Sequence, residues 1–268
     1  MKIGHMLMTD PKDARGNTVP WRQFLAQAKA WGLEGVDLFP FYLEKAGTTV
    51  DEAAKAIRDL GLEIAVYCVP TDLVSADPAV RQQSLDRVAA FADKALALGV
   101  GHLFSHGGQH NNKGEEALAR YVDGLQQAAC LCAERGLAFS IENAGSLCHT
   151  HEEMARCLDA VARPNMRLTI DTGNFVLAGS DPHEAIRRLA PRVEHVHVKN
   201  FTDAPGRTPR PFRYCSPRAG KVDYAYVVAR LREAGYHGYV SFEPEGFPDA
   251  QAEDGIRYLA ELLGRPAR

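Results

Sequence analysis

The stretch GLAFSIEN (residues 136–143) contains the unit from which the fold can be predicted. An amphipathic run over residues 115–135 precedes it, and Gly136 stands where glycines commonly end helices. The residues that follow form a short, mostly apolar β-type run that ends on Glu142. Alternating helices and strands predict a parallel sheet with right-handed crossovers. The same order of helix, glycine and strand recurs at Gly32, Gly61, Gly99 and Gly235.

Eight strand-then-helix units fill residues 1–268, which favours a single (β/α)8 barrel, a TIM barrel, as one domain. No G-x-G-x-x-G or Walker turn follows the first strand, so an open nucleotide-binding sheet is disfavoured. The longest stretch without a helical pattern, Phe201–Lys221, is expected to form a loop above the C-terminal mouth. The predicted strands are Lys2–Met8, Gly35–Phe39, Glu63–Val69, Gly101–His106, Ala138–Asn143, Arg167–Asp171, Glu194–Lys199 and Gly238–Glu243. The predicted helices are Trp21–Trp31, Asp51–Leu60, Ala79–Leu98, Glu115–Arg135, His151–Ala162, Pro182–Leu189, Tyr224–Ala234 and Ala250–Leu263.

The composition is that of a folded chain without extreme charge. Of its 268 residues 46% are hydrophobic, and the net charge is −3, with acidic and basic residues mixed along the chain. Neither nucleic acid nor an anionic membrane is therefore an expected partner. The first residues lack a signal-peptide pattern, no apolar run approaches the ~20 residues that span a bilayer, and the six cysteines are scattered. These features predict a cytoplasmic protein with reduced thiols.

Near their C-terminal ends, four consecutive strands carry side chains that can bind a metal, namely Glu142, Asp171, His197 and Glu243. The residue before each of them is apolar, and successive side chains of a strand point to opposite faces. Because the apolar set must face the surrounding helices, the three acids and the histidine should point inward at the C-terminal mouth.

Three inward carboxylates without a cation would repel one another. A divalent ion removes this repulsion, and three carboxylates plus one imidazole suit Mn²⁺, Mg²⁺ or Co²⁺, with Zn²⁺ also compatible. The sequence therefore predicts one divalent metal ion held by Glu142, Asp171, His197 and Glu243, with Mn²⁺ as the first choice.

Several short motifs occur together in one order. They are GVD (35–37), SIEN (140–143), IDTGN (170–174), HVHVK (195–199) and SFE (241–243). Over essentially its whole length the chain resembles the sugar isomerase/epimerase branch of the xylose-isomerase-like barrels. The resemblance implies that the same four residues are the metal ligands. It also implies that Glu142 and Glu243 act as acid and base.

The order of the strands supports the acid and base roles independently. The predicted strands that end on Glu142 and Glu243 are the fifth and the eighth, so the two carboxylates should face each other across the mouth. A 2-hydroxy ketone between them could lose a proton to one and regain it from the other, through a metal-bound cis-enediolate. The predicted activity is a metal-dependent isomerase or epimerase of a ketose or a related hydroxy-carbonyl polyol.

Four further residues are candidates for contact with the substrate. His106 ends the fourth strand at the level of the ligands, and Lys199 shares a face with His197. Phe39 ends the second strand and could form an apolar wall for the C–H faces of a polyol. Asn174 stands where sugar epimerases of the family often carry a substrate-binding histidine, so the resemblance does not by itself imply their sugar specificity.

Other functions stay open at this point. A dehydratase or lyase of an inosose- or dehydroshikimate-like substrate begins with the same proton abstraction and needs the same metal. A sugar-binding barrel without turnover would keep the same pocket. DNA repair, as in the endonuclease IV relatives, is disfavoured because Asn174 replaces an expected histidine and the net charge is −3. The expected partner is a small sugar or polyol, and a homo-oligomer is compatible with the sequence.

Overall fold

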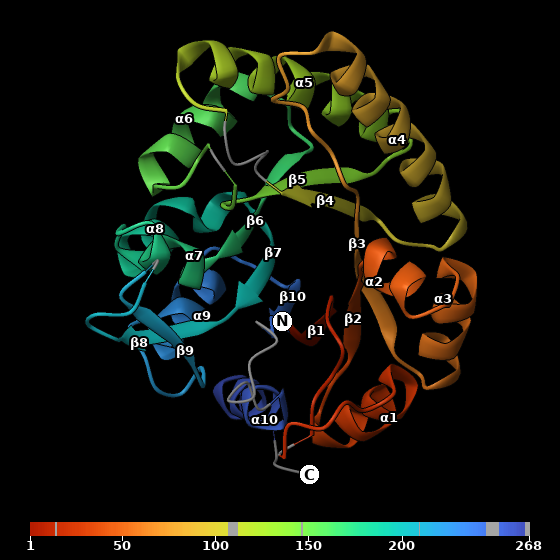
Figure 1. The fold of residues 1–268 in the computed structure, drawn as a ribbon, viewed down its shortest axis with the longest axis vertical. Helices are drawn as coiled ribbons and strands as arrows, with labels where there is room; N and C mark the ends of the chain where they lie inside the picture. The colour runs from red at the N-terminus through yellow and green to blue at the C-terminus, as the bar shows by residue number, and fades with distance from the viewer. Residues whose placement is uncertain (14, 107–111, 146, 209, 245–251, 266–268) are drawn as a thin grey trace.

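Eight parallel strands form a closed barrel in the computed structural model, which describes residues 1–13, 15–106, 112–145, 147–208, 210–244 and 252–265. The strands follow one another around the ring in the order β1-β10-β7-β6-β5-β4-β3-β2. Figure 1 shows the helices arranged around the outside of this ring, and the predicted single (β/α)8 TIM barrel is therefore confirmed. The barrel strands are β1 (Lys2–Leu7), β2 (Gly35–Leu38), β3 (Glu63–Cys68), β4 (His102–His106), β5 (Ala138–Glu142), β6 (Met166–Asp171), β7 (Val193–Val198) and β10 (Tyr239–Phe242).

The predicted helices all form, and their ends lie within a residue or two of the predicted ones. Thr49 and Thr150 begin two of them with capping boxes, in which side chain and backbone exchange hydrogen bonds. Among the described residues, no helix is both long enough and apolar enough to cross a membrane. The predicted start of the last helix, Ala250, lies outside the described residues. The helices are α1 (Trp21–Trp31), α3 (Val50–Asp59), α4 (Pro78–Ala97), α5 (Glu115–Ala133), α6 (His151–Val161), α8 (Pro182–Leu189), α9 (Tyr224–Glu233) and α10 (Ala252–Leu262).

Several short elements were not predicted. The helices α2 (Pro40–Lys45) and α7 (Thr172–Leu177) directly follow β2 and β6, and the 3-10 helix η1 (Ala190–Arg192) follows α8. The segment expected to be a loop instead contains an antiparallel hairpin of β8 (Asn200–Asp203) and β9 (Phe212–Cys215). Ring packing between Phe201 and Tyr214, at 5.8 Å between centroids, joins the two strands. The loop prediction was wrong because this hairpin depends on such cross-strand contacts more than on a local apolar pattern.

The register of the barrel places the ends of neighbouring strands at one level. Asp171, which ends β6, pairs with His197 of β7. Glu243 follows β10 directly, and its N–H donates a hydrogen bond of 3.0 Å to the carbonyl of Val198. The polar residues that end these strands are thereby gathered at the mouth.

The inner face of the barrel carries polar side chains on several strands. His102 Nε2 lies 2.6 Å from the hydroxyl of Ser140, and that hydroxyl lies 2.6 Å from the hydroxyl of Thr169. All three side chains are buried. Barrels of this class are usually filled with branched apolar residues, so this interior departs from the common pattern.

Candidate metal centre

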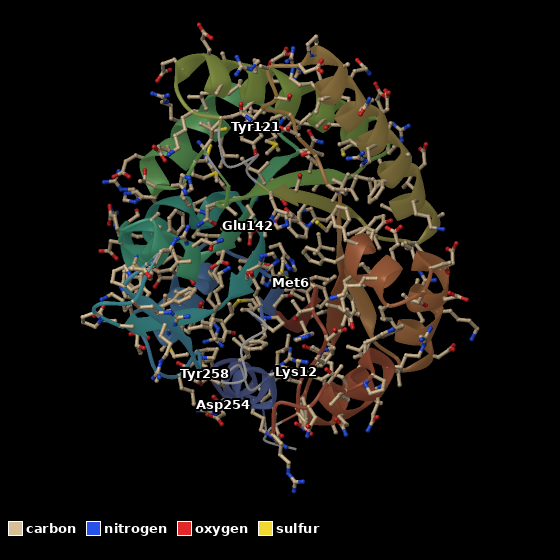
Figure 2. The ribbon with its side chains drawn as sticks, in the orientation of Figure 1. Met6, Lys12, Tyr121, Glu142, Asp254 and Tyr258 are labelled. Atoms are coloured by element: carbon tan, nitrogen blue, oxygen red, sulfur yellow. The ribbon has the colours of Figure 1, made fainter. Side chains whose placement is uncertain are left out.

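The four predicted ligands lie together at the C-terminal end of the strands. Each of them offers a ligand atom within 4.8 Å of those of the other three. All four side chains are buried, and Glu243, the most exposed of them, is 5% exposed. Figure 2 shows Glu142 inside the ring of helices, at the end of β5. The four side chains that were predicted to point inward at the mouth therefore lie in one cluster.

Both glutamates approach the same nitrogen of His197. Nδ1 of His197 lies 2.6 Å from Oε1 of Glu142 and 3.6 Å from Oε2 of Glu243. Within the described part of the chain, Oε2 of Glu243 is buried and takes no hydrogen bond, and Oδ2 of Asp171, equally buried, has the ammonium of Lys199 at 2.9 Å. Buried oxygens of this kind are costly unless a cation or a donor meets them. The cluster could therefore hold a divalent metal ion.

The electrostatics of the cluster also favour a cation. Burial raises the pKa of Asp171 well above its ordinary value, and the charges of Glu243 and Glu142 add to the rise, although Lys199 opposes it. Burial acts in the same direction on Glu142, but the charge of His197 and the hydrogen bonds of His197 and His106 outweigh it and hold the pKa of Glu142 low. The raised pKa of Asp171 indicates that the charge of Lys199 does not offset burial and the repulsion of the two glutamates, and a divalent cation would relieve both.

Lys199 lies inside the cluster. Its ammonium is 2.9 Å from Oδ2 of Asp171 and 2.8 Å from Oε1 of Glu243, and the residue is 4% exposed. The hydroxyl of Tyr224 fixes the backbone of Lys199, because it donates to the Lys199 carbonyl at 2.7 Å and accepts from the Lys199 N–H at 3.0 Å. Contact between Lys199 and a substrate stays a prediction, but its ammonium stands beside two of the proposed ligands.

His106 and Phe39 lie on the other side of Glu142. Nδ1 of His106 is 2.8 Å from Oε2 of Glu142, and the side chain of His106 is 46% exposed. The ring of His106 contacts the rings of Phe39 and Phe104, with centroids 6.1 and 5.5 Å apart. Phe39 is 5% exposed and therefore mostly part of the core. His106 thus reaches both the cluster and the surface, and its binding of substrate remains a prediction.

Asn174 contacts the cluster through its backbone. Its N–H donates a hydrogen bond of 3.0 Å to Oδ1 of Asp171, which caps the short helix α7. This contact leaves one oxygen of Asp171 for the cluster. The predicted substrate contact of the Asn174 side chain is still a prediction.

Three buried polar residues below the cluster had no role assigned from the sequence. Asp37 lies 3.4 Å from Nε2 of His197, and its carboxylate is hydrogen-bonded to His195 and to Ser241, both at 2.9 Å. The sequence alone could have drawn attention to Asp37, because it is a charged residue within the short apolar strand GVDL (35–38).

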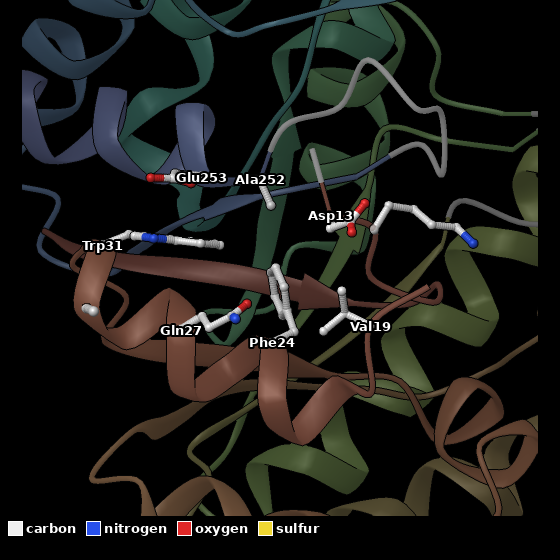
Figure 3. Close-up of a pocket in the computed structure, with 9 residues that line it drawn as sticks. Asp13, Val19, Phe24, Gln27, Trp31, Ala252 and Glu253 are labelled. Carbon is white, nitrogen blue, oxygen red and sulfur yellow. The ribbon is translucent and has the colours of Figure 1, made fainter. Parts of the chain in front are cut away.

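A separate cavity of about 370 Å³ lies outside the barrel, between α1 and α10. Figure 3 shows Phe24 and Trp31 of α1 on one side of it and Ala252 and Glu253 of α10 on the other. None of the predicted site residues is among those that line it. The predicted chemistry therefore belongs to the mouth of the barrel and not to this cavity.

The chain is similar to curated proteins that are named as a dehydratase and as a putative isomerase. Inosose dehydratase of Geobacillus kaustophilus is 31% identical over 92% of this chain and 76% of that protein. Putative hydroxypyruvate isomerase of Homo sapiens is 25% identical over 87% of this chain and 86% of that protein.

Solved structures share the fold at lower identity. The probable 3-DHS dehydratase AsbF from Bacillus anthracis has a TM-score of 0.76 and 17% identity, and the similarity covers 99% of both chains. The IOLI protein with a bound zinc atom has a TM-score of 0.74 and 17% identity, over 98% of this chain and 96% of that one. The model of the family described as xylose isomerase-like TIM barrel matches residues 25–262, a range that contains the barrel strands from β2 to β10 and the four proposed ligands. The chain therefore belongs to the xylose isomerase-like TIM barrel family.

Proposed function

We propose that this protein is a divalent-metal-dependent enzyme that removes a proton next to the carbonyl group of a small polyhydroxylated substrate. Glu142, Asp171, His197 and Glu243 would hold the ion, and Mn²⁺ is our first choice. When bound, the ion would polarise the substrate carbonyl and stabilise negative charge on its oxygen. The observation that carries the proposal is the approach of Glu142 and Glu243 to one nitrogen of His197 within a buried cluster.

Glu142 and Glu243 are the proposed proton carriers. They come from different strands and reach the same small volume, so a carbon held beside His197 would lie within reach of both carboxylates. Each glutamate also has its own cationic or hydrogen-bonding partner, His106 for Glu142 and Lys199 for Glu243. Such a partner can hold a carboxylate in place while it takes up or returns a proton.

We place dehydration of a keto-polyol similar to inosose first among the reactions. The inosose dehydratase relative, 31% identical over 92% of the chain, supports this choice. Loss of water needs an acid for the departing hydroxyl as well as a base for the C–H group. Lys199 offers an ammonium 2.8 Å from Glu243, which places an acid beside a base. The carboxylate of Glu243 takes the proton from the substrate C–H group, and a C=C bond forms. The adjacent C–O bond breaks as the ammonium of Lys199 protonates the departing hydroxyl, which leaves as water.

Isomerisation or epimerisation is the second candidate, and the paired glutamates support it. No leaving group is needed, because the proton taken by one carboxylate is replaced at the neighbouring carbon or on the opposite face by the other. The hydroxypyruvate isomerase relative is compatible with this reaction. The sequence alone favoured isomerisation or epimerisation. Dehydration is now our first choice because of the position of Lys199 and the dehydratase relative.

The reactions can be separated by incubating the metal-loaded protein in D₂O with a 2-keto cyclitol and with a panel of ketoses. Loss of water with the ultraviolet absorbance of an enone or diketone supports dehydration. Deuterium uptake at C3 without loss of water supports epimerisation. Saturable sugar binding without either reaction would favour a barrel that binds sugar without turnover.

Metal content tests the proposal as a whole. The purified protein should contain a stoichiometric divalent ion, and added Mn²⁺ should raise the melting temperature of chelator-treated protein. A protein that holds no such ion and shows no metal-dependent thermal shift contradicts the proposed enzyme.

A further inference from the structure

The second ring nitrogen of His197 faces the interior of the barrel. Among the described residues Nε2 is buried and makes no hydrogen bond, and it lies 3.4 Å from Oδ2 of Asp37, whereas Nδ1 lies 2.6 Å from Oε1 of Glu142. The two nitrogens of one ring therefore meet carboxylates on opposite sides. Asp37 and His197 are both 0% exposed, so solvent does not weaken the interaction between them.

Asp37 is itself held from two further strands. Its Oδ2 accepts a hydrogen bond of 2.9 Å from Nε2 of His195 on β7, and its Oδ1 accepts one of 2.9 Å from the hydroxyl of Ser241 on β10. A buried carboxylate is stable only when such partners meet it. The same partners fix the direction in which the carboxylate faces His197.

Space for Ser241 comes from Gly4 on the neighbouring strand β1. Gly4 pairs with Ser241 in the barrel, and a Cβ added at Gly4 would collide with the Ser241 hydroxyl. An alanine at this position would therefore push the hydroxyl away from Asp37. Because Gly4 has no side chain, the Ser241 hydroxyl has room to hydrogen-bond the carboxylate of Asp37.

We propose that Asp37 is a positioning residue that keeps the proton of His197 on Nε2 and so presents Nδ1 to the metal. This inference rests on the metal site proposed above. Histidines that bind metals commonly donate their other ring N–H to a carboxylate, which fixes the ring and its tautomer and strengthens metal binding. Asp37 acts through His197 and not on the substrate.

Asp37→Asn tests the inference, because the amide keeps the size of the carboxylate and removes its charge. Titration of the metal-free protein with Co²⁺, followed by the visible absorption of the bound ion, measures affinity without any substrate. We expect the affinity to fall about 10- to 100-fold. Nitrogen-15 NMR of the zinc-loaded protein should show the His197 proton on Nε2 in the wild type and a changed Nε2 signal in the variant. Asp123→Asn, at an exposed position of α5, is the matched control and should keep wild-type affinity.

Ser241→Ala provides a second measurement that does not depend on the folding of Asp37→Asn. It removes one hydrogen bond to Asp37 and leaves the carboxylate in place, so a smaller loss of Co²⁺ affinity is expected. Wild-type affinity in both variants, or in Ser241→Ala if Asp37→Asn does not fold, overturns the role of Asp37. A wild-type protein that takes up no Co²⁺ overturns the metal site as well, which separates the two failures.

Discussion

The hydroxyl of Tyr214 donates a hydrogen bond of 2.8 Å to the backbone carbonyl of Glu243. Tyr214 belongs to β9 of the hairpin that follows β7, and it is 3% exposed. The hairpin therefore holds the chain at the end of β10, where one of the two proposed proton carriers stands. A segment outside the barrel thus helps to fix a residue inside its mouth.

Tyr214→Phe should lower the free energy of unfolding by about 1 kcal/mol, the net value of a typical hydrogen bond. It should also lower kcat more than it changes KM, because Glu243 loses its support while the substrate contacts remain. Urea unfolding and steady-state kinetics measure the two effects. Tyr226→Phe on α9 is the control. A Tyr214 variant with unchanged stability and kinetics would show that the hairpin does not support Glu243.

Glu142→Gln and Glu243→Gln should each lower kcat by at least about 100-fold, because an amide cannot take up the proton. Rates are compared at saturating Mn²⁺, since both residues are also proposed ligands. Circular dichroism should show an intact fold in both variants. Glu116→Gln changes a glutamate whose side chain is 97% exposed and should keep the wild-type rate. Wild-type turnover in either of the first two variants rules out the proposed proton carrier.

Lys199→Met should destabilise the metal-free protein more than the metal-loaded protein. Removal of the ammonium leaves Asp171 and Glu243 buried without that positive charge, and breaking a buried ion pair costs about 3–5 kcal/mol. A bound divalent ion supplies positive charge to the same carboxylates, so the loss should shrink. Urea unfolding with a chelator and with saturating Mn²⁺ measures the difference. Equal losses under both conditions would contradict the metal site.

Stability should fall between pH 6.5 and pH 4 because of His5. Its ring is 2% exposed and packs against Phe24 and Phe242, with centroids 4.8 and 5.9 Å away. Burial lowers the pKa of His5 from 6.5 to about 4, although the charge of Asp37 opposes the shift. The unfolded chain therefore binds a proton near pH 6.5, whereas the folded protein binds it only near pH 4. The free energy of unfolding is unaffected above this range and drops by about 3 kcal/mol across it.

His5→Leu should remove this part of the pH dependence, since leucine does not titrate. Urea unfolding of the wild type and the variant at pH 7 and pH 5 provides the comparison. The stability difference between the two proteins should shift in favour of the variant at pH 5. A shift of the opposite sign, or none, would show that His5 is not the titrating group.

The ligand cluster could be predicted because it depends on one local rule. Side chains of a strand alternate, so every second residue near the end of a strand faces the mouth. Glu142, Asp171 and His197 follow this rule and meet. The same rule placed Lys199 on the face of His197, but its ion pair with Asp171 depends on how β6 and β7 are aligned.

The remaining features depend on tertiary partners that no local pattern encodes. The helix α7 has six residues, too few for stability on its own, and it begins where Asp171 accepts the N–H of Asn174. Asp37 and His195 are 158 residues apart in the sequence, so their hydrogen bond follows only from closure of the barrel. The charged residue within strand β2 was visible in the sequence, but its partners were not.

The hydrogen-bonded side chains of His102, Ser140 and Thr169 inside the barrel limit how this protein can be re-engineered. A barrel filled with aliphatic residues tolerates exchanges that conserve volume. Here each such exchange would leave a buried donor or acceptor without its partner, at a cost of about 1–3 kcal/mol. A search for thermostable variants should therefore leave the inner face untouched and draw its changes from the outer helices.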